Sequence, residues 1–275
     1  MYMAKSKSYK FNQHNKRELS TARAIAHGHI FSRDNFMDLG TKTMFYKYLN
    51  SELIKPVDGK DGYYTITPKF INTYTSQIDS NYQSASSGSI IHSSGVMQVV
   101  SRIIPQGAKI ENEGVLKEEL KEYQKTTEYM RKEAQLREEY KHRMDEIRNE
   151  LKVSATPIER HEAMSAFNLC NKFYSGVENM CSCPDMRITV DRNQISELIN
   201  NISSMEHSTD RQESYARHAI RTLREIQETI TTEQVEIFVE ITTSNYGSVE
   251  IQAKENVARI TDTRIIYFAA NEETI

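Results

Sequence analysis

The sequence has no long apolar run and few cysteines. No stretch approaches about 18 consecutive apolar residues, which excludes an apolar helix that spans a membrane. The first residues, MYMAKSKSYKFNQHNKREL, are basic and polar and lack the apolar core of a signal peptide. The 3 cysteines are too few for a disulfide framework and suit a reducing compartment. We therefore expect a cytoplasmic protein without a membrane partner.

Charge is plentiful, and it is unevenly distributed. The 275 residues are 38% hydrophobic and 27% charged, and the net charge is −3. Residues 1–75 contain 12 Lys and Arg against 6 Asp and Glu, whereas residues 151–275 contain 12 against 19. A chain of this length is long enough for two domains of ordinary size. The basic N-terminal part is the part that we expect to contact a polyanion.

The N-terminal part predicts three short helices followed by a hairpin. Ser20 and Ser32 are the expected N-caps of the first two helices. A glycine-containing turn, DGKDG, joins the two extended runs of the hairpin. The expected segments are helices within residues 20–31, 32–40 and 41–54, and extended runs at 54–57 and 63–67.

This order of elements is that of a winged helix-turn-helix. The stretch LNSELIKPVDGKDGYYTITPKF resembles the recognition-helix end and the wing of many bacterial members. A basic helix of this size fits the major groove, and wing lysines reach phosphates. We therefore expect double-stranded DNA as the partner. The predicted DNA-binding residues are Thr41, Lys42, Thr43, Tyr46 and Lys47 on the helix, and Lys55, Lys60 and Lys69 on or near phosphates.

The pair His27-Gly28-His29 invites a metal-site interpretation. Histidines two residues apart in a helix point to different sides, and no third ligand lies near them in the sequence. We therefore expect ordinary structural histidines at these positions.

A polar stretch separates this module from the rest of the chain. Residues 76–95 are rich in Ser, Asn and Gly, as linkers are. We accordingly predict a winged-helix domain at 1–78, a linker at 79–95 and a second domain at 96–275.

The second domain begins with an unusually long helical pattern. Neither Gly nor Pro occurs from Val115 to Lys152, and the run predicts an amphipathic helix roughly 55 Å long. We treat it as an insertion at about 114–152. Its apolar stripe slips in heptad phase, which argues against an uninterrupted two-stranded coiled coil. Either a helix of the same chain or of a second copy covers the stripe, or the helix protrudes as an arm. We expect an arm that is used in self-association, and therefore a homo-oligomer.

Acidic residues mark two strands farther along the chain. Pro184-Asp185 precedes an alternating run, and VEIFVEITT, residues 235–243, alternates with Glu240 at its centre. A predicted helix that carries Lys254 and an apolar strand, RIIYFAAN, follow. Glu240 can be an ordinary solvated strand carboxylate, or half of a metal site whose partner is Asp185.

This arrangement resembles the PD-(D/E)xK nuclease-like fold. The fold class is therefore expected to be α+β, with a winged helix followed by an α/β core that carries the helical insertion. More narrowly, residues 20–110 and 180–270 resemble the replication-relaxation family of bacterial mobile elements. Two further stretches carry this resemblance: IIHSSGVMQVV, which is similar to its His-initiated helix, and KIENEGVLKEE, a Glu-bearing segment.

The resemblance implies a set of site residues. Asp185 and Glu240 would bind Mg²⁺ or Mn²⁺, a lysine would position the attacking water, and His92 would face the site. Either Glu111 or Glu113 would be an additional acid. Thr242 stands where an active nuclease would have its lysine, and Lys254 can reach back from the next helix. Catalysis is thus left open.

These observations predict a sequence-specific DNA-binding protein of a bacterial plasmid, phage or conjugative element. It would act as a regulator or accessory factor in replication or mobilisation. One alternative is a metal-dependent DNA nickase or relaxase-like nuclease. Another is a scaffold that docks proteins through the winged helix and the long helix.

Overall fold

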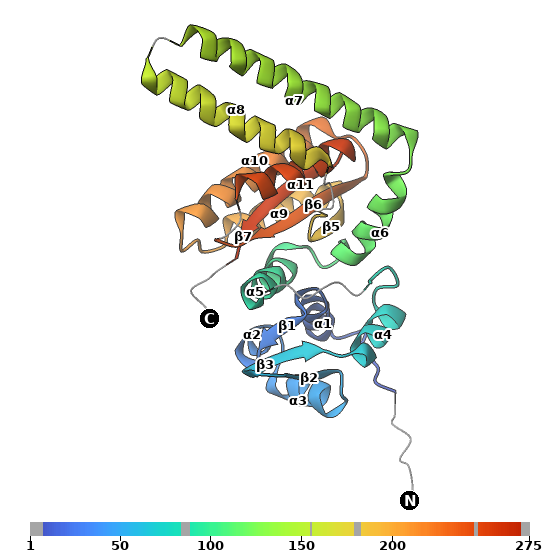
Figure 1. Cartoon of the computed structure of the whole chain (residues 1–275). Coiled ribbons are helices and arrows are strands. Elements are labelled where there is room, and N and C mark those ends of the chain that lie inside the picture. Colours follow the sequence, from blue (N-terminus) through green and yellow to red (C-terminus); the bar gives the residue numbers. More distant parts are fainter. Residues whose placement is uncertain (1–7, 84–88, 155, 179–182, 245–246, 271–275) are drawn as a thin grey trace, which may run out of the picture.

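The protein is mixed α+β. The computed structural model describes residues 8–83, 89–154, 156–178, 183–244 and 247–270. These residues form 11 α-helices and two small sheets. Figure 1 shows the first sheet with helices α1–α4 at the N-terminal end, the second sheet beyond α5, and the α7–α8 hairpin at the far end. No helix in the described ranges has the length and apolarity needed to cross a bilayer.

The first helices follow their caps. Helix α1 is Lys16–Gly28 and begins a turn earlier than predicted, because the Asn15 side chain, and not that of Ser20, accepts the N-cap hydrogen bond. The predicted first helix was too long at its end, because Ile30 and Phe31 belong to strand β1 (Ile30–Ser32). Ser32 caps α2 (Arg33–Leu39) as expected, and its side chain accepts from the main-chain N–H of Asn35. Helix α3 is Lys42–Asn50.

The hairpin completes the first sheet. Strand β2 is Ile54–Val57, as predicted, and β3 is Lys60–Ile66, which begins three residues earlier than expected. Both outer strands pair antiparallel with β3, in the order β1-β3-β2. Helix α4 (Pro68–Gln77), which the sequence reasoning did not propose, follows Thr67 as its N-cap. An aromatic core holds the module together and includes Phe31, Phe36, Phe45, Tyr48, Phe70 and Tyr74.

The predicted linker, residues 79–95, is packed at both of its ends. Tyr82 is 4% exposed and its hydroxyl donates to the carbonyl of Ala26 at 2.9 Å. Helix α5 (Ile90–Gln98) begins inside the predicted linker and continues as a short π-helix, Val99–Ile103. The serines and glycine that suggested a linker cap this helix and allow close packing. A Cβ on Gly95 would lie 2.7 Å from Cγ2 of Ile241.

The second sheet has four strands in the order β4-β5-β6-β7. Strand β4 is Lys109–Asn112, β5 is Met186–Asp191, β6 is Gln234–Thr242 and β7 is Arg264–Ala269. The first two pairings are antiparallel, and β6 pairs parallel with β7. Helix α11 (Ser248–Ile260) makes the crossover between those parallel strands.

Helices cover both faces of this sheet. Helices α9 (Ile195–Ser203) and α10 (Asp210–Thr229) join α5 on one face, in one core with the apolar side chains Val235, Ile237, Val239 and Ile241 of β6. Helix α11 packs on the other face, where Phe238 lies. The centre of β6 is therefore buried on both sides, although an alternating strand commonly has one buried face.

The long helical insertion is two helices and not one. Helix α6 (Glu113–Tyr123) ends before Thr126, whose side chain accepts from the N–H of Tyr129 and caps α7 (Thr127–Val153). Helix α8 (Pro157–Glu178) folds back along α7 as a hairpin (Figure 1). Met144 and Ile147 of α7 form a small core with Ala163 and Cys170 of α8. The same chain therefore covers the outer part of the apolar stripe.

Candidate functional site

Asp185 and Glu240 meet where two strands run side by side. Asp185 immediately precedes β5, and Glu240 lies in β6, next to Val239, which pairs with Met186. The main-chain N–H of Asp185 donates to Oε2 of Glu240 at 3.0 Å, and the N–H of Ile241 donates to Oδ2 of Asp185 at 2.7 Å. Each carboxylate is therefore held by the main chain beside the other.

Lys254 reaches Glu240 from helix α11. Its Nζ lies 3.1 Å from Oε1 of Glu240 and also donates to the carbonyl oxygen of Cys183. Glu240 is 2% exposed and Lys254 is 7% exposed. A buried carboxylate needs a partner of opposite charge, and Lys254 supplies it. This places the predicted lysine at the predicted acid.

His92 approaches Asp185 from helix α5. Its Nε2 lies 3.0 Å from Oδ2 of Asp185. Burial lowers the pKa of His92, but the hydrogen bond to Asp185 and the negative charges of Asp185 and Glu240 outweigh this effect and raise the pKa above its ordinary value. Each of the two acids thus has a basic side chain beside it, His92 at Asp185 and Lys254 at Glu240.

Thr242, where the resemblance would place a lysine, has a structural role. It is fully buried, and its hydroxyl donates to the carbonyl of Phe268 at 3.3 Å, across to β7. A lysine there would bury an ammonium group between two strands. The site therefore has its lysine on α11 and none on β6.

Of the two remaining acids, Glu113 is the one at the site. It begins α6, lines the same cavity as His92 and Asp185, and pairs with Lys117 at 2.7 Å. Glu111 turns away from this cavity and pairs with Lys109 and Arg187.

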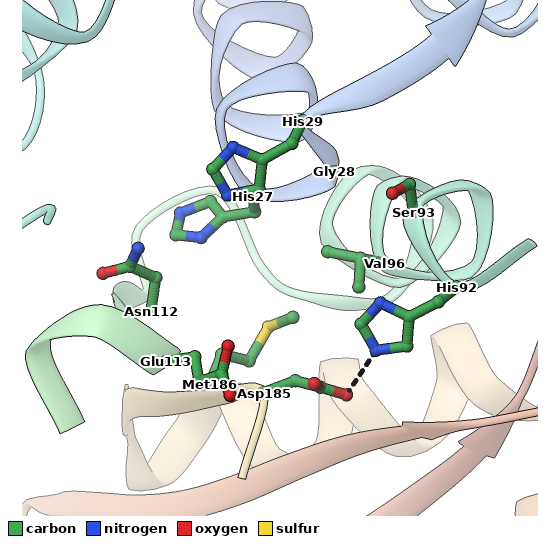
Figure 2. A pocket seen from close by; sticks show the side chains of 10 residues that line it. All are labelled: His27, Gly28, His29, His92, Ser93, Val96, Asn112, Glu113, Asp185 and Met186. Atoms are coloured by element: carbon green, nitrogen blue, oxygen red, sulfur yellow. Dashed lines mark ion pairs between the residues drawn. The ribbon is translucent and has the colours of Figure 1, made fainter. Parts of the chain in front are cut away.

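A cavity of about 30 Å³ lies beside Asp185, between α1, α5 and the start of β5. Figure 2 shows His27 and His29 on one side of it, with His92, Asp185 and Glu113 on the other. The two histidines that sequence reasoning set aside thus belong to the wall of this cavity. His92, Glu113 and Asp185, which share this wall, are more than 60 residues away in the sequence. The spacing within the HGH stretch could therefore not predict that the two histidines lie beside them.

Both of these histidines are neutral. Burial lowers the pKa of His27 to about 3, with smaller contributions from the positive charges of Arg23 and His29. Burial also lowers the pKa of His29 to about 4, and the charge of His92 adds to the effect. His29 has φ 64°, a left-handed conformation that is uncommon outside glycine.

The donor chemistry suits a hard cation, but the ligands are few. Asp185 and Glu240 offer carboxylate oxygens, which Mg²⁺ and Mn²⁺ prefer. In the described part of the chain, no group of three or more His, Cys, Asp or Glu side chains is arranged to hold a metal ion. Mg²⁺ commonly takes one or two protein carboxylates and completes its shell with water and substrate phosphate. Of the two carboxylates, Asp185 lines the cavity and Glu240 does not, so a Mg²⁺ that arrives with a phosphate would meet Asp185 first and would compete with Lys254 for Glu240.

A second candidate site is the outer surface of α3 and the β2–β3 hairpin. Six of the eight predicted DNA-binding residues are exposed there: Lys42, Thr43, Tyr46, Lys47, Lys55 and Lys60. Asn50 shares the exposed face of α3, and Arg33 of α2 lies 5.8 Å above the Tyr46 ring. Sequence reasoning named neither of these two, although the seven-residue spacing from Thr43 to Asn50 placed Asn50 on the same helical face.

Three of the predicted DNA-binding residues, among them the exposed Lys47, have local partners. The Thr41 hydroxyl caps α3 by accepting from the N–H of Met44. Lys47 lies 3.5 Å from Glu18 and over the Tyr9 ring, and Lys69 lies 3.6 Å from Glu52. Their charges are thus partly neutralised within the module.

Comparison with known proteins gives no relatives. No protein-family model matches the chain, and neither a curated protein nor a solved structure matches it.

Proposed function

We propose that the protein binds double-stranded DNA through α3 and the β2–β3 hairpin, as a winged helix does. It would act as a regulator or accessory factor in the replication or mobilisation of a bacterial plasmid, phage or conjugative element. The host element and the replication-relaxation family rest on the sequence resemblance alone.

One observation carries the proposal: α3 presents an exposed polar face beside an exposed, lysine-bearing hairpin. Lys42, Tyr46 and Asn50 share that face, and Lys55 and Lys60 lie on the hairpin strands. Lysines bind phosphates and fix the register on the duplex, while amide and hydroxyl groups read base edges. The apolar side of α3, with Met44, Phe45 and Tyr48, is buried against the module, so its polar side faces outward.

Selection from a pool of random duplexes tests this proposal. We expect enrichment of a sequence motif by the full chain, and loss of binding when Lys42, Lys55 and Lys60 are all replaced by alanine. Lys141→Ala is a matched control, because Lys141 is an exposed lysine of α7 that pairs with Glu138. Failure to retain any duplex, or equal retention by the triple variant, would contradict the proposal.

A metal-dependent nickase is the second candidate, and a separate observation favours it. A strand preceded by Asp185, a neighbouring strand with Glu240, a helix with Lys254 and a final parallel strand follow the order that the PD-(D/E)xK resemblance implies. Asp185 and Glu240 would hold Mg²⁺ or Mn²⁺, which would supply Lewis-acid stabilisation of a phosphodiester. Lys254 would hold the Glu240 carboxylate in place.

Incubation of supercoiled plasmid with the protein and Mg²⁺ or Mn²⁺ tests this candidate. Conversion to the open circular form is expected, together with its loss in Asp185→Asn and Glu240→Gln variants. Intact plasmid, or nicking that survives both substitutions, would contradict nickase activity without affecting the DNA-binding proposal.

A further inference from the structure

A second, larger cavity lies away from the Asp185–His92 pair. It has a volume of about 350 Å³ and lies between α6, α11 and strands β5 and β6. Its apolar wall is built by Leu116, Leu120 and Tyr123 of α6, Phe238 of β6 and Val257 of α11. Cavities of roughly 300–1,000 Å³ with mostly apolar walls are typical of small-molecule sites.

Charged residues surround this apolar wall, and acids predominate. The cavity is lined by the acids Glu119, Glu128, Glu236 and Asp262 and by two cations, Lys132 and Arg187. The acid side chains are 49%, 58%, 53% and 75% exposed, whereas those of Lys132 and Arg187 are 15% and 16% exposed. The carboxylates are thus more exposed than the cations with which they pair: Lys132 pairs with Glu128 and Asp262, and Arg187 pairs with Glu119 and Glu236. Four acids share two cations, which leaves an excess of negative charge at the mouth.

We propose that this cavity binds a small amphipathic cation, namely a primary alkylamine whose short chain carries an aromatic ring. The ring would be buried against the apolar wall, because removal of apolar surface from water is favourable. The ammonium group would stay at the mouth, where the excess of carboxylates attracts it. An aromatic carboxylic acid of the same size meets the same wall but is repelled at the mouth.

The cavity is also next to the buried ion pair. Cys183 lines it, and the carbonyl oxygen of Cys183 accepts a hydrogen bond from Nζ of Lys254. A ring in the cavity would therefore touch a residue that holds Lys254, so the amide resonances of Cys183 and Lys254 report its presence. The proposal itself does not depend on DNA binding or on nuclease activity.

The test uses two indoles of similar size and opposite charge, followed by amide chemical shifts of the full chain. Tryptamine is expected to perturb α6, β5 and β6 near the cavity in a saturable manner. Indole-3-propionate is expected to bind about tenfold more weakly at low salt, and the difference is expected to shrink as salt is added. Equal affinities, or perturbations located elsewhere, would overturn the proposal.

Two kinds of variant test the apolar wall and the exposed acids at the mouth, here called the rim, independently. Leu120→Trp fills the cavity and should abolish tryptamine binding. Should that variant fail to fold, Glu119→Gln with Glu236→Gln removes two exposed rim charges and should reduce the preference for tryptamine severalfold. Glu225→Gln, on the exposed side of α10, is the matched control and should leave the preference unchanged. If the double variant keeps the full preference for tryptamine over indole-3-propionate, the proposal is wrong. Binding of a Lys-Trp peptide without binding of tryptamine would also overturn it, because that result indicates a protein partner.

Discussion

Asp185 and Glu240 hold one another in place through the main chain. The N–H of Asp185 donates to the Glu240 carboxylate, and the N–H of Ile241, the residue after Glu240, donates to the Asp185 carboxylate. This reciprocal pair fixes two negative groups side by side. His92 lies 3.0 Å from Asp185 and Lys254 lies 3.1 Å from Glu240, so each acid has one basic neighbour.

Removal of the Asp185 carboxylate should reveal this arrangement. Asp185→Ala leaves the N–H of Ile241 without its acceptor, and we expect a loss of about 1–3 kcal/mol in the free energy of unfolding. Asp185→Asn keeps an acceptor oxygen and should cost less. Urea denaturation of both variants measures the difference. Equal losses would show that the hydrogen bond to Ile241 contributes little.

The Glu240–Lys254 pair should behave as a coupled unit. Lys254→Met removes the cation beside the buried Glu240 carboxylate and should destabilise the fold by about 3–5 kcal/mol. Adding Glu240→Leu removes the buried negative charge and should restore much of that loss. A double-mutant cycle by urea denaturation measures the coupling. Additive effects of the two substitutions would contradict a direct ion pair.

Acid should weaken the fold through His27. Burial is the largest of the effects that lower the pKa of His27 to about 3 in the folded protein. In the unfolded chain, the pKa of a histidine is about 6.5. The stability from neutral His27 is therefore complete above about pH 6.5 and falls as the pH drops toward 3. His29 acts in the same direction, and His92, with its raised pKa, acts in the opposite one.

His27→Phe isolates this contribution. Between about pH 6.5 and 5, the free energy of unfolding of the wild type should fall more steeply than that of the variant, and the difference should approach about 1.4 kcal/mol per pH unit at the acidic end. The other side chains around the cavity are the same in both proteins. Parallel pH profiles would mean that His27 is protonated in the folded state.

The helical hairpin provides a test of self-association. Val153 and Ile158, next to the turn between α7 and α8, are 81% and 70% exposed. If the hairpin mediates a homo-oligomer, Val153→Ser with Ile158→Ser should lower the mass measured by light scattering. A monomeric wild type, or an unchanged oligomer in the double variant, would contradict this role.

Local rules predicted much of the fold. The Ser32 cap, the strand Ile54–Val57 and the alternating run of β6 each depend on a few neighbouring residues, and all three were placed correctly. The break at Thr126 is also local, but it was missed because the absence of Gly and Pro suggested an uninterrupted helix. A threonine cap interrupts a helix without either residue.

Tertiary packing decided the remainder. The closeness of Asp185, Glu240 and Lys254 was expected from the resemblance, and the structure brings these three residues together. The positions of His27 and His29 at the same cavity depend on how α1 packs against α5 and the second sheet. No spacing within the HGH stretch reports such packing.

The central claim is that α3 and the hairpin bind DNA, and the salt dependence of binding tests it most directly. Fluorescence anisotropy with the selected duplex gives the slope of log K against log salt concentration. We expect a negative slope, made shallower by about 0.9 for each of Lys42→Ala and Lys60→Ala that removes a phosphate contact, with no change in Lys141→Ala. Affinity independent of salt, or slopes identical in the wild type and both lysine variants, would contradict the claim.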